Sequence, residues 1–306
     1  MNTVSEGNPI SDHRSDPREE PSGDFVLAID FGGTKVALAT ADFTGRLLEQ
    51  TRLETNAAHG ALQVLERTFL AAHPLIERTE AGTGGRCVAA GVISPGVILP
   101  DRILLAPNIP GWGEIALLDS MRAGLGMARV AVGNDVKAAA AAEVRWGSLQ
   151  RADPAIYLSL GTGVAVALVV NGQPLAGAHG ASGEFGYNLR SVSDTRGAAD
   201  DCAPLEECIG GKAVGERGSL LLGTNVSTAD LFASSNPRAL ALIDEVLAEL
   251  ALHITNMAIV LDPARVAVGG GWMAAGDRIL AALKARFSFA VPFPPVVVPA
   301  KFVHDA

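Results

Sequence analysis

Two segments of this chain, about 130 residues apart, share one pattern: an apolar run breaks at a glycine and threonine turn and then resumes. The first covers residues 25–39 with its turn at 32–34, and the second covers residues 155–170 with its turn at 161–163. Each predicts a β-hairpin, because glycine accepts the positive φ values that a tight turn needs. Such turns point backbone N–H groups and a hydroxyl toward one place, which suits an anion. The pair predicts two similar lobes that face each other across the phosphates of a nucleotide.

The composition restricts the class of protein. The chain has 306 residues, 48% of them hydrophobic, which is enough for two domains with their own cores. A formal net charge of −9 argues against a nucleic-acid partner or an anionic membrane surface. Polar residues or glycines interrupt every apolar run before the ~20 residues that span a bilayer. The chain has only three cysteines, so we expect no disulfide framework. A cytoplasmic location is expected for the same reason.

The order of elements predicts an α/β protein with two lobes. Residues 1–24 are polar, contain no stretch that could act as a signal peptide, and are predicted to be disordered. Residues 25–137 are assigned to an N-terminal lobe and residues 138–306 to a C-terminal lobe, because strands alternate with helices in both. The boundary follows a short strand at 129–133 that leads into an alanine-rich helix.

Further elements follow from periodicity. Residues 56–78 are predicted to be helical, with an apolar face formed by Leu62, Leu65, Phe69 and Leu70. A buried strand at 87–93 runs into a Ser-Pro-Gly turn, a long amphipathic helix covers about 237–260, and a strand at 265–268 precedes three glycines.

Eight short motifs follow one another along the chain: DFGGTK at 30–35, SPG at 94–96, PNIPGW at 107–112, ND at 134–135, GTG at 161–163, GEFG at 183–186, LE at 205–206, and DP at 262–263 with GG at 269–270. In this order, they resemble the ROK family of sugar kinases within the actin-like ATPase superfamily. The resemblance extends from residue 25 nearly to the C-terminus. It implies a two-lobed actin-like ATPase (ribonuclease H-like) fold with a cleft between the lobes, and an ATP-dependent phosphotransferase acting on a hexose or a sugar-like acceptor.

Asp135 is the residue that we expect to act as the general base. It lies where a strand is predicted to pass into a helix, and a helix N-terminus favours an ionised carboxylate that can accept a proton from a hydroxyl. An aspartate at such a place can also serve only as a helix cap. The surrounding motifs favour catalysis over capping.

The two turns would hold the phosphates of ATP, with Mg²⁺ as the second cofactor. The resemblance assigns Asp30 to Mg²⁺ through water, places Lys35 nearby, and uses the glycines after strand 265–268 for a close approach to the adenosine. The expected nucleotide-binding residues are Asp30, Gly32, Gly33, Thr34, Lys35, Gly161, Thr162, Gly163, Gly269 and Gly270.

Recognition of a sugar needs short polar side chains, because an unpaired buried polar group costs about 1–3 kcal/mol and so rejects wrong isomers. The resemblance carries this role onto several positions, although the two glutamates among them could instead be exposed loop residues. The expected acceptor-binding residues are Gly96, Asn108, Asn134, Asp135, Glu184, Tyr187 and Glu206.

The chain departs from the family pattern around residue 187. Many ROK kinases have a histidine there and three closely spaced cysteines downstream that bind zinc. Here the position is Tyr187, and Cys202 and Cys208 form no Cys-x-Cys or Cys-x-x-Cys pair, so no zinc site is predicted. The larger phenol favours a modified hexose or a carbocyclic sugar analogue (cyclitol) as much as glucose. Tyr187 could also simply fill core space.

Other interpretations stay open. Polyphosphate could replace ATP as donor, as in some zinc-free relatives. A sugar-responsive transcription regulator is disfavoured, because the 24 residues before the first strand are too few for a winged helix-turn-helix. A sugar-binding protein without activity is a third possibility. The resemblance implies a homodimer. It also implies a final helix after the region 301–306, where this sequence stops; either the sequence is truncated or that helix is dispensable.

Overall fold

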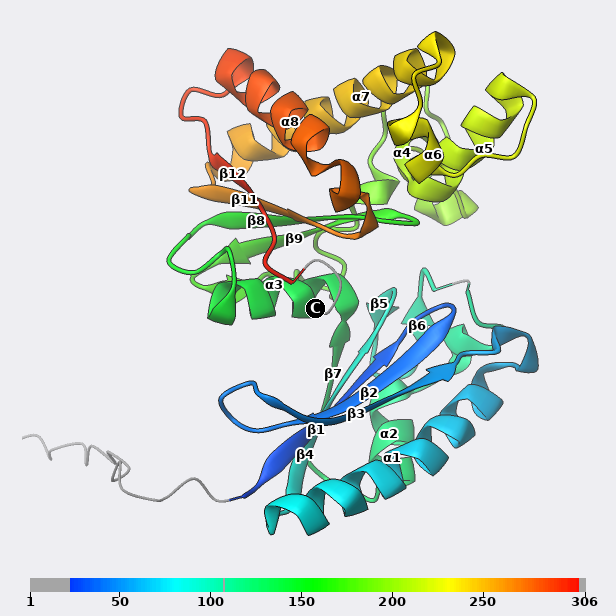
Figure 1. Ribbon diagram of the computed structural model, residues 1–306, viewed down its shortest axis with the longest axis vertical. Helices are drawn as coiled ribbons and strands as arrows, with labels where there is room; N and C mark the ends of the chain where they lie inside the picture. The colour runs from blue at the N-terminus through cyan, green and yellow to red at the C-terminus, as the bar shows by residue number, and fades with distance from the viewer. Residues whose placement is uncertain (1–22, 107, 303–306) are drawn as a thin grey trace, which may run out of the picture.

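The chain forms two α/β lobes, one above the other in Figure 1. The computed structural model describes residues 23–106 and 108–302. The tail predicted to be disordered lies outside these residues except for its last two positions, and its state is not described. Between the lobes, strand β7 (Val130–Asn134) leads directly into helix α3 (Asp135–Trp146), which packs on the sheet of the C-terminal lobe. The predicted α/β class is confirmed.

The N-terminal lobe is built on a five-stranded sheet in the order β3-β2-β1-β4-β7. Strand β1 is antiparallel to β2 and parallel to β4, and β4 is parallel to β7. The carboxyl ends of β1, β4 and β7 therefore lie at one edge of the sheet, where an open α/β sheet offers a binding site. The other strands of this lobe are β1 (Phe25–Phe31), β2 (Lys35–Ala41), β3 (Leu47–Glu54), β4 (Cys87–Ser94) and the short pair β5 (Val97–Ile98) and β6 (Ile103–Leu104).

The C-terminal lobe repeats this plan, with the strand order β10-β9-β8-β11-β12. An antiparallel β8–β9 hairpin is followed by strands β11 and β12, which run parallel to β8. Both predicted hairpins are therefore present, in the same place in two equivalent sheets. The strands are β8 (Ala155–Leu160), β9 (Val164–Val170), β10 (Gln173–Pro174), β11 (Arg265–Gly269) and β12 (Val296–Pro299).

Helix α1 (Ala61–Thr83) differs from the prediction in its start and in the face that it buries. It begins at Ala61 rather than residue 56, because Asn56 has a left-handed backbone and a 3₁₀ turn intervenes. Leu62 and Leu70 are 74% and 69% exposed, so the predicted apolar face was wrong at these two positions. The buried face instead includes Val64 and Leu75, which pack with α2 (Leu117–Leu125) against the sheet. A run with several apolar residues permits more than one helical face, and tertiary packing selects among them.

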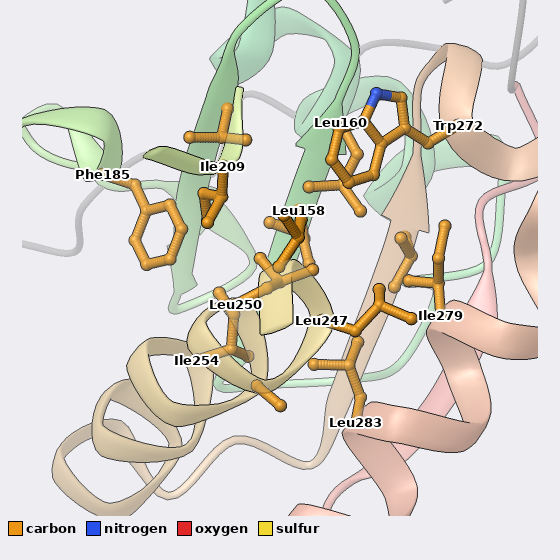
Figure 2. Packing of buried hydrophobic residues seen from close by; sticks show 14 of the residues in the cluster. Leu158, Leu160, Phe185, Ile209, Leu247, Leu250, Ile254, Trp272, Ile279 and Leu283 are labelled. Carbon is orange, nitrogen blue, oxygen red and sulfur yellow. The ribbon is translucent and has the colours of Figure 1, made fainter. Parts of the chain in front are cut away.

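The helices of the C-terminal lobe cover the face of its sheet away from the N-terminal lobe (Figure 1). Figure 2 shows apolar side chains from β8, α7, α8 and neighbouring segments meeting in one core, with Trp272 at its edge. The long helix predicted near 237–260 is present, with Asn236 as its cap and Pro237 in its first turn. The helices are α4 (Glu206–Ile209), α5 (Gly211–Leu222), α6 (Thr228–Ala233), α7 (Pro237–Leu261) and α8 (Gly276–Ala290). Within the described ranges, no helix has the length and apolar content to cross a membrane.

A fully buried carboxylate, Glu143 on α3, ties the last described residues to the region between the lobes. Its Oε2 accepts a hydrogen bond from the Ser148 amide at 2.5 Å, and its Oε1 accepts one from the Phe302 amide at 2.7 Å. Ser148 Oγ donates to the Pro299 carbonyl at 2.8 Å, and Lys301 Nζ donates to the Trp146 carbonyl at 2.9 Å. The segment after β12 is therefore held against the end of α3.

Replacing Glu143 by alanine is expected to lower the free energy of unfolding by about 1–3 kcal/mol, because two partly buried N–H groups lose their acceptor. The Glu143→Gln variant keeps one acceptor oxygen and is expected to lose less. Urea denaturation followed by circular dichroism measures both. Equal unfolding midpoints for Glu143→Ala and the unaltered protein would contradict this role.

Candidate active site

The site begins where β4 and β7 end side by side. Ser94 and Asn134 are paired at the carboxyl ends of these parallel strands. Asn134 Nδ2 donates to the Gly96 carbonyl at 3.1 Å, and its Oδ1 accepts from the Lys137 amide at 3.1 Å. One side chain therefore fixes both the SPG turn and the first turn of α3.

Trp112 contacts the end of β4 from within the core of the N-terminal lobe. It was not among the site residues expected from the sequence. Its Nε1 donates to Ser94 Oγ at 2.9 Å, and its ring lies 4.9 Å from that of Phe31, centroid to centroid. The indole is 1% exposed, so it joins β1 to β4 through the core. The sequence feature that could have indicated this role is a tryptophan in a loop rich in proline and glycine.

Asp135 is the first residue of α3, and the structure separates it from the capping role. The cap of α3 is Asn134, whereas Asp135 Oδ1 accepts a hydrogen bond from the Val136 amide at 2.9 Å. Burial raises the pKa of Asp135 above its ordinary value, opposed by the amide bond and by the charge of Lys137. The capping interpretation was therefore wrong, since that role falls on the neighbouring residue.

Asp30, near the end of β1, lies close enough to Asp135 for the two charges to interact. Burial, together with a smaller contribution from the negative charge of Asp135, raises the pKa of Asp30 to about 6. One of these carboxylates belongs to the N-terminal sheet and the other to α3. The two acids therefore meet beside the connection between the lobes, where a site between the lobes is expected.

The first glycine turn, at residues 32–34, is fixed by hydrogen bonds at Gly32 and exposed at its other two residues. The Gly32 amide donates to the Lys35 carbonyl at 2.9 Å, and Thr55 Oγ1 donates to the Gly32 carbonyl at 2.7 Å. Gly33, Thr34 and Lys35 are exposed. A side chain at Gly33 would meet Asn108 at 3.5 Å, so the structure brings this predicted acceptor-binding residue beside the turn.

The second turn, at residues 161–163, is tied to the start of α5. The amides of Gly211 and Lys212 donate to the carbonyls of Gly161 and Thr162 at 3.1 and 3.0 Å. Glu206 Oε2 accepts a hydrogen bond from the Val164 amide at 2.9 Å, and a side chain at Gly163 would overlap this carboxylate. Glu206 therefore supports the turn directly, a contact that the sequence did not indicate.

Next to the second turn is a cavity of about 810 Å³ that the sequence did not predict. It is open on one side, mixes polar and apolar groups, and is large enough for a nucleoside. The glycine-rich stretch before and within α5 was the available signal. The lining residues include Gly161, Thr162, Gly211, Lys212, Gly215, Ser219, Asn225, Val226, Thr228 and Trp272.

Gly269 and Gly270 lie where the end of β11 packs closely against β8. A side chain at Gly269 would collide with the Tyr157 hydroxyl, and one at Gly270 with the Leu160 carbonyl. Gly269 is buried and Gly270 has a φ of 89°. These glycines permit close packing of β11 on β8, and Trp272, just beyond them, is the residue that reaches the cavity.

Glu184 and Tyr187 lie on the other side of Asp135, around a 3₁₀ turn at Phe185–Tyr187. Burial raises the pKa of Glu184; Lys137 lowers it, and Asp135 and Glu206 raise it. Burial also raises the pKa of Tyr187, with further contributions from Glu206 and Glu184. Tyr187 is half-buried beside these acids, so it does not simply fill the core.

The region that corresponds to the zinc motif contains a polar cavity of about 540 Å³ lined by Cys202, Cys208 and three arginines. Arg190 Nε donates to Glu249 Oε1 at 2.9 Å, and Arg217 donates to Glu245 at 2.7 Å and to the Cys208 carbonyl at 2.8 Å. Ion pairs from Arg190 and Arg217 to glutamates of α7 therefore fix the residues around this cavity. In the part of the chain that the structure describes, no group of three or more His, Cys, Asp or Glu residues is placed to hold a metal ion.

Comparison with known proteins agrees with this arrangement. A model of the ROK family matches residues 26–305, and the chain belongs to this family. It is 28% identical over 293 residues to the glucokinase of Halalkalibacterium halodurans, covering 88% of this chain and 87% of that protein. It is 29% identical over 260 residues to the kanosamine kinase of Amycolatopsis mediterranei, covering 84% and 83% of the two proteins. The crystal structure of a ROK hexokinase from Thermus thermophilus matches with a TM-score of 0.77 at 26% identity, over 92% of this chain and 94% of that one. The predicted two-lobed actin-like ATPase fold is confirmed.

Replacing Asp30 by asparagine is expected to stabilise the fold at neutral and alkaline pH. The folded chain binds the Asp30 proton more tightly than the unfolded chain, so stability is kept at low pH and lost as the pH rises through about 6. The gain at about pH 8 should be about 1–2 kcal/mol, allowing for solvent that reaches this carboxylate. It should shrink at about pH 4.5, where Asp30 holds its proton in the folded protein. Thermal unfolding at both pH values tests this, and a pH-independent difference would contradict it.

Proposed function

We propose that this chain is an ATP-dependent kinase that transfers a phosphoryl group to a hydroxyl of a hexose or hexose derivative, with Asp135 as the general base. Membership of the ROK family and the curated sugar kinases similar to this chain support a phosphotransferase with a sugar acceptor. The observation that carries the proposal is the position of Asp135, beside Asp30 from the N-terminal sheet and Glu184 from the C-terminal lobe. Asn134 performs the capping, which leaves the carboxylate of Asp135 for a substrate.

The donor would lie across the two glycine turns. The cavity of about 810 Å³ includes Gly161 and Thr162, so an adenosine in it would direct its phosphates toward the turn at 161–163. The open turn at 32–34 belongs to the N-terminal lobe and would approach the terminal phosphate. Backbone N–H groups at such turns stabilise the charge that develops during phosphoryl transfer.

Asp30 is the carboxylate that we assign to Mg²⁺. When bound with the nucleotide, Mg²⁺ supplies charge neutralisation at the phosphates. The residues fit this role, because Asp30 is a partly buried acid at the carboxyl end of β1, directly before the first phosphate turn. Burial and, second, the negative charge of Asp135 raise its pKa, and a bound cation would offset both effects.

The acceptor would lie between Asn134, Glu184 and the SPG turn. Asn108 and Glu184 offer hydrogen bonds to ring hydroxyls, and the Gly96 backbone and Tyr187 complete the surroundings. Burial raises the pKa of Asp135, and a base is most effective when its pKa approaches the working pH. The hydroxyl would donate its proton to the Asp135 carboxylate as its oxygen attacks the terminal phosphorus of ATP. The bond from that phosphorus to the bridging oxygen breaks at the same time, and ADP is the leaving group.

Replacing Asp135 by asparagine is expected to lower kcat by about 100- to 10,000-fold, because the proton acceptor is lost. Acceptor binding should persist, since asparagine keeps the shape and a hydrogen-bonding oxygen. Acceptor-dependent ADP release and calorimetric binding measure the two effects. Asp119→Asn, at an exposed position on α2, is the matched control. A variant at residue 135 with most of its turnover would exclude Asp135 as the base.

The acceptor itself is identified by a panel of glucose, mannose, fructose, amino and N-acetylated hexosamines and cyclitols, each with ATP or polyphosphate and Mg²⁺. ADP release with a hexose or amino hexose supports the proposal. A sugar that binds without turnover would favour the non-catalytic or regulatory alternative.

The nucleotide position is tested by filling cavities one at a time. Asn225→Trp adds an indole to the cavity next to Thr162, and is expected to raise the KM for ATP about 10-fold or more by steric exclusion, with little change in the KM for the acceptor. Ala274→Trp is the matched control, because Ala274 lines a neighbouring cavity of about 570 Å³ instead. If Ala274→Trp raised the KM for ATP and Asn225→Trp did not, the adenosine would be assigned to the second cavity instead.

A further inference from the structure

Lys137 has a place in this site that neither the motifs nor the proposed roles account for. It lies in the first turn of α3, two residues after Asp135. A cation there is opposed by the positive end of the helix dipole, so the local sequence works against it. Local rules are broken most often at functional positions.

The side chain of Lys137 makes one specific long-range contact. Its Nζ donates a hydrogen bond to the Gly180 carbonyl at 2.8 Å. Gly180 lies in the loop 177–183, which leads directly to Glu184 and contains three glycines with positive φ. A loop of this kind has little stiffness of its own, so an anchor at its middle decides where it lies.

The anchored loop also touches the N-terminal lobe. A side chain at Gly180 would lie 3.7 Å from Val97 Cγ1 and 3.8 Å from the Ile98 carbonyl, so the loop tip lies against β5. Strand β5 follows Gly96 directly. The Lys137–Gly180 hydrogen bond therefore joins three segments around the proposed acceptor position: α3, the loop before Glu184, and the SPG turn with β5.

The charges around Lys137 favour the same arrangement. Its ammonium group interacts with the carboxylates of both Glu184 and Asp135, which repel each other. Asp30, Glu206 and the Tyr157 and Tyr187 hydroxyls complete the charged and titratable groups around this place. A cation between two carboxylates from different elements allows them to approach at moderate cost.

We propose that Lys137 is a positioning residue for the acceptor: it fixes loop 177–183, and through it Glu184, at a set distance from Asp135. This inference rests on the proposed function, in which Glu184 contacts the acceptor and Asp135 takes its proton. Lys137 acts through these two carboxylates and does not contact the reacting atoms.

Lys137→Met removes the donor and the charge but keeps most of the apolar stem. It is expected to raise the KM for the acceptor about 10- to 100-fold, because a small displacement of Glu184 weakens its contacts, and to leave the KM for ATP nearly unchanged. Lys137→Arg keeps a cationic donor and should restore most of the loss. Lys284→Met, at an exposed position on α8, is the matched control.

Hydrogen exchange followed by mass spectrometry tests the anchor without any assay of activity. Peptides covering residues 176–184 should exchange about 10-fold faster in Lys137→Met than in the unaltered protein and Lys137→Arg, since a lost anchor permits local opening. An unchanged acceptor KM together with unchanged exchange would overturn the proposal. If the unaltered protein phosphorylates no acceptor, the proposed function fails instead, and the exchange result still decides whether Lys137 holds the loop.

Discussion

The geometry of the site depends on the two hydrogen bonds of the Asn134 side chain. One bond caps α3 and the other holds the Gly96 carbonyl, so a single amide connects the ends of β4 and β7 with the helix that carries the proposed base. Because an amide both donates and accepts whereas an ionised carboxylate only accepts, an aspartate at this position could not make both bonds. The same junction is where the chain passes from one lobe to the other, so the proposed base lies at the connection between the lobes.

Buried acids gather at this junction and oppose folding. The pKa values of Asp30, Asp135 and Glu184 are all raised, chiefly by burial, so their ionised forms carry a cost in the folded state. A site that binds phosphates through turns and cations can use such acids, and the stability lost there must be recovered elsewhere. The large C-terminal core of Figure 2 and the buried Glu143 contacts are where the structure offers compensation.

Repetition of one strand plan in two lobes explains why glycines at equivalent places have different roles. Both hairpin turns lie at the same position of equivalent sheets. In the turn at 161–163, however, Gly163 is required because Glu206 occupies the space of a side chain, whereas Gly33 faces outward beside Asn108. Gly269 and Gly270 permit close packing of β11 on β8. Glycines in similar motifs are therefore required for different reasons, because different residues surround them.

Local pattern was sufficient for the two hairpins, the strand before the SPG turn, the long helix near α7 and the family itself, because each depends on periodicity or on short motifs in order. It also identified Asp135 as a candidate, since a strand-to-helix junction can be read from neighbouring residues. The face of α1 that is buried, the cavity beside Thr162, the support of a turn by Glu206 and the reach of Lys137 to Gly180 were decided only by the tertiary structure. These features join residues that are distant in the sequence, and their contacts arise from packing, which no local pattern encodes.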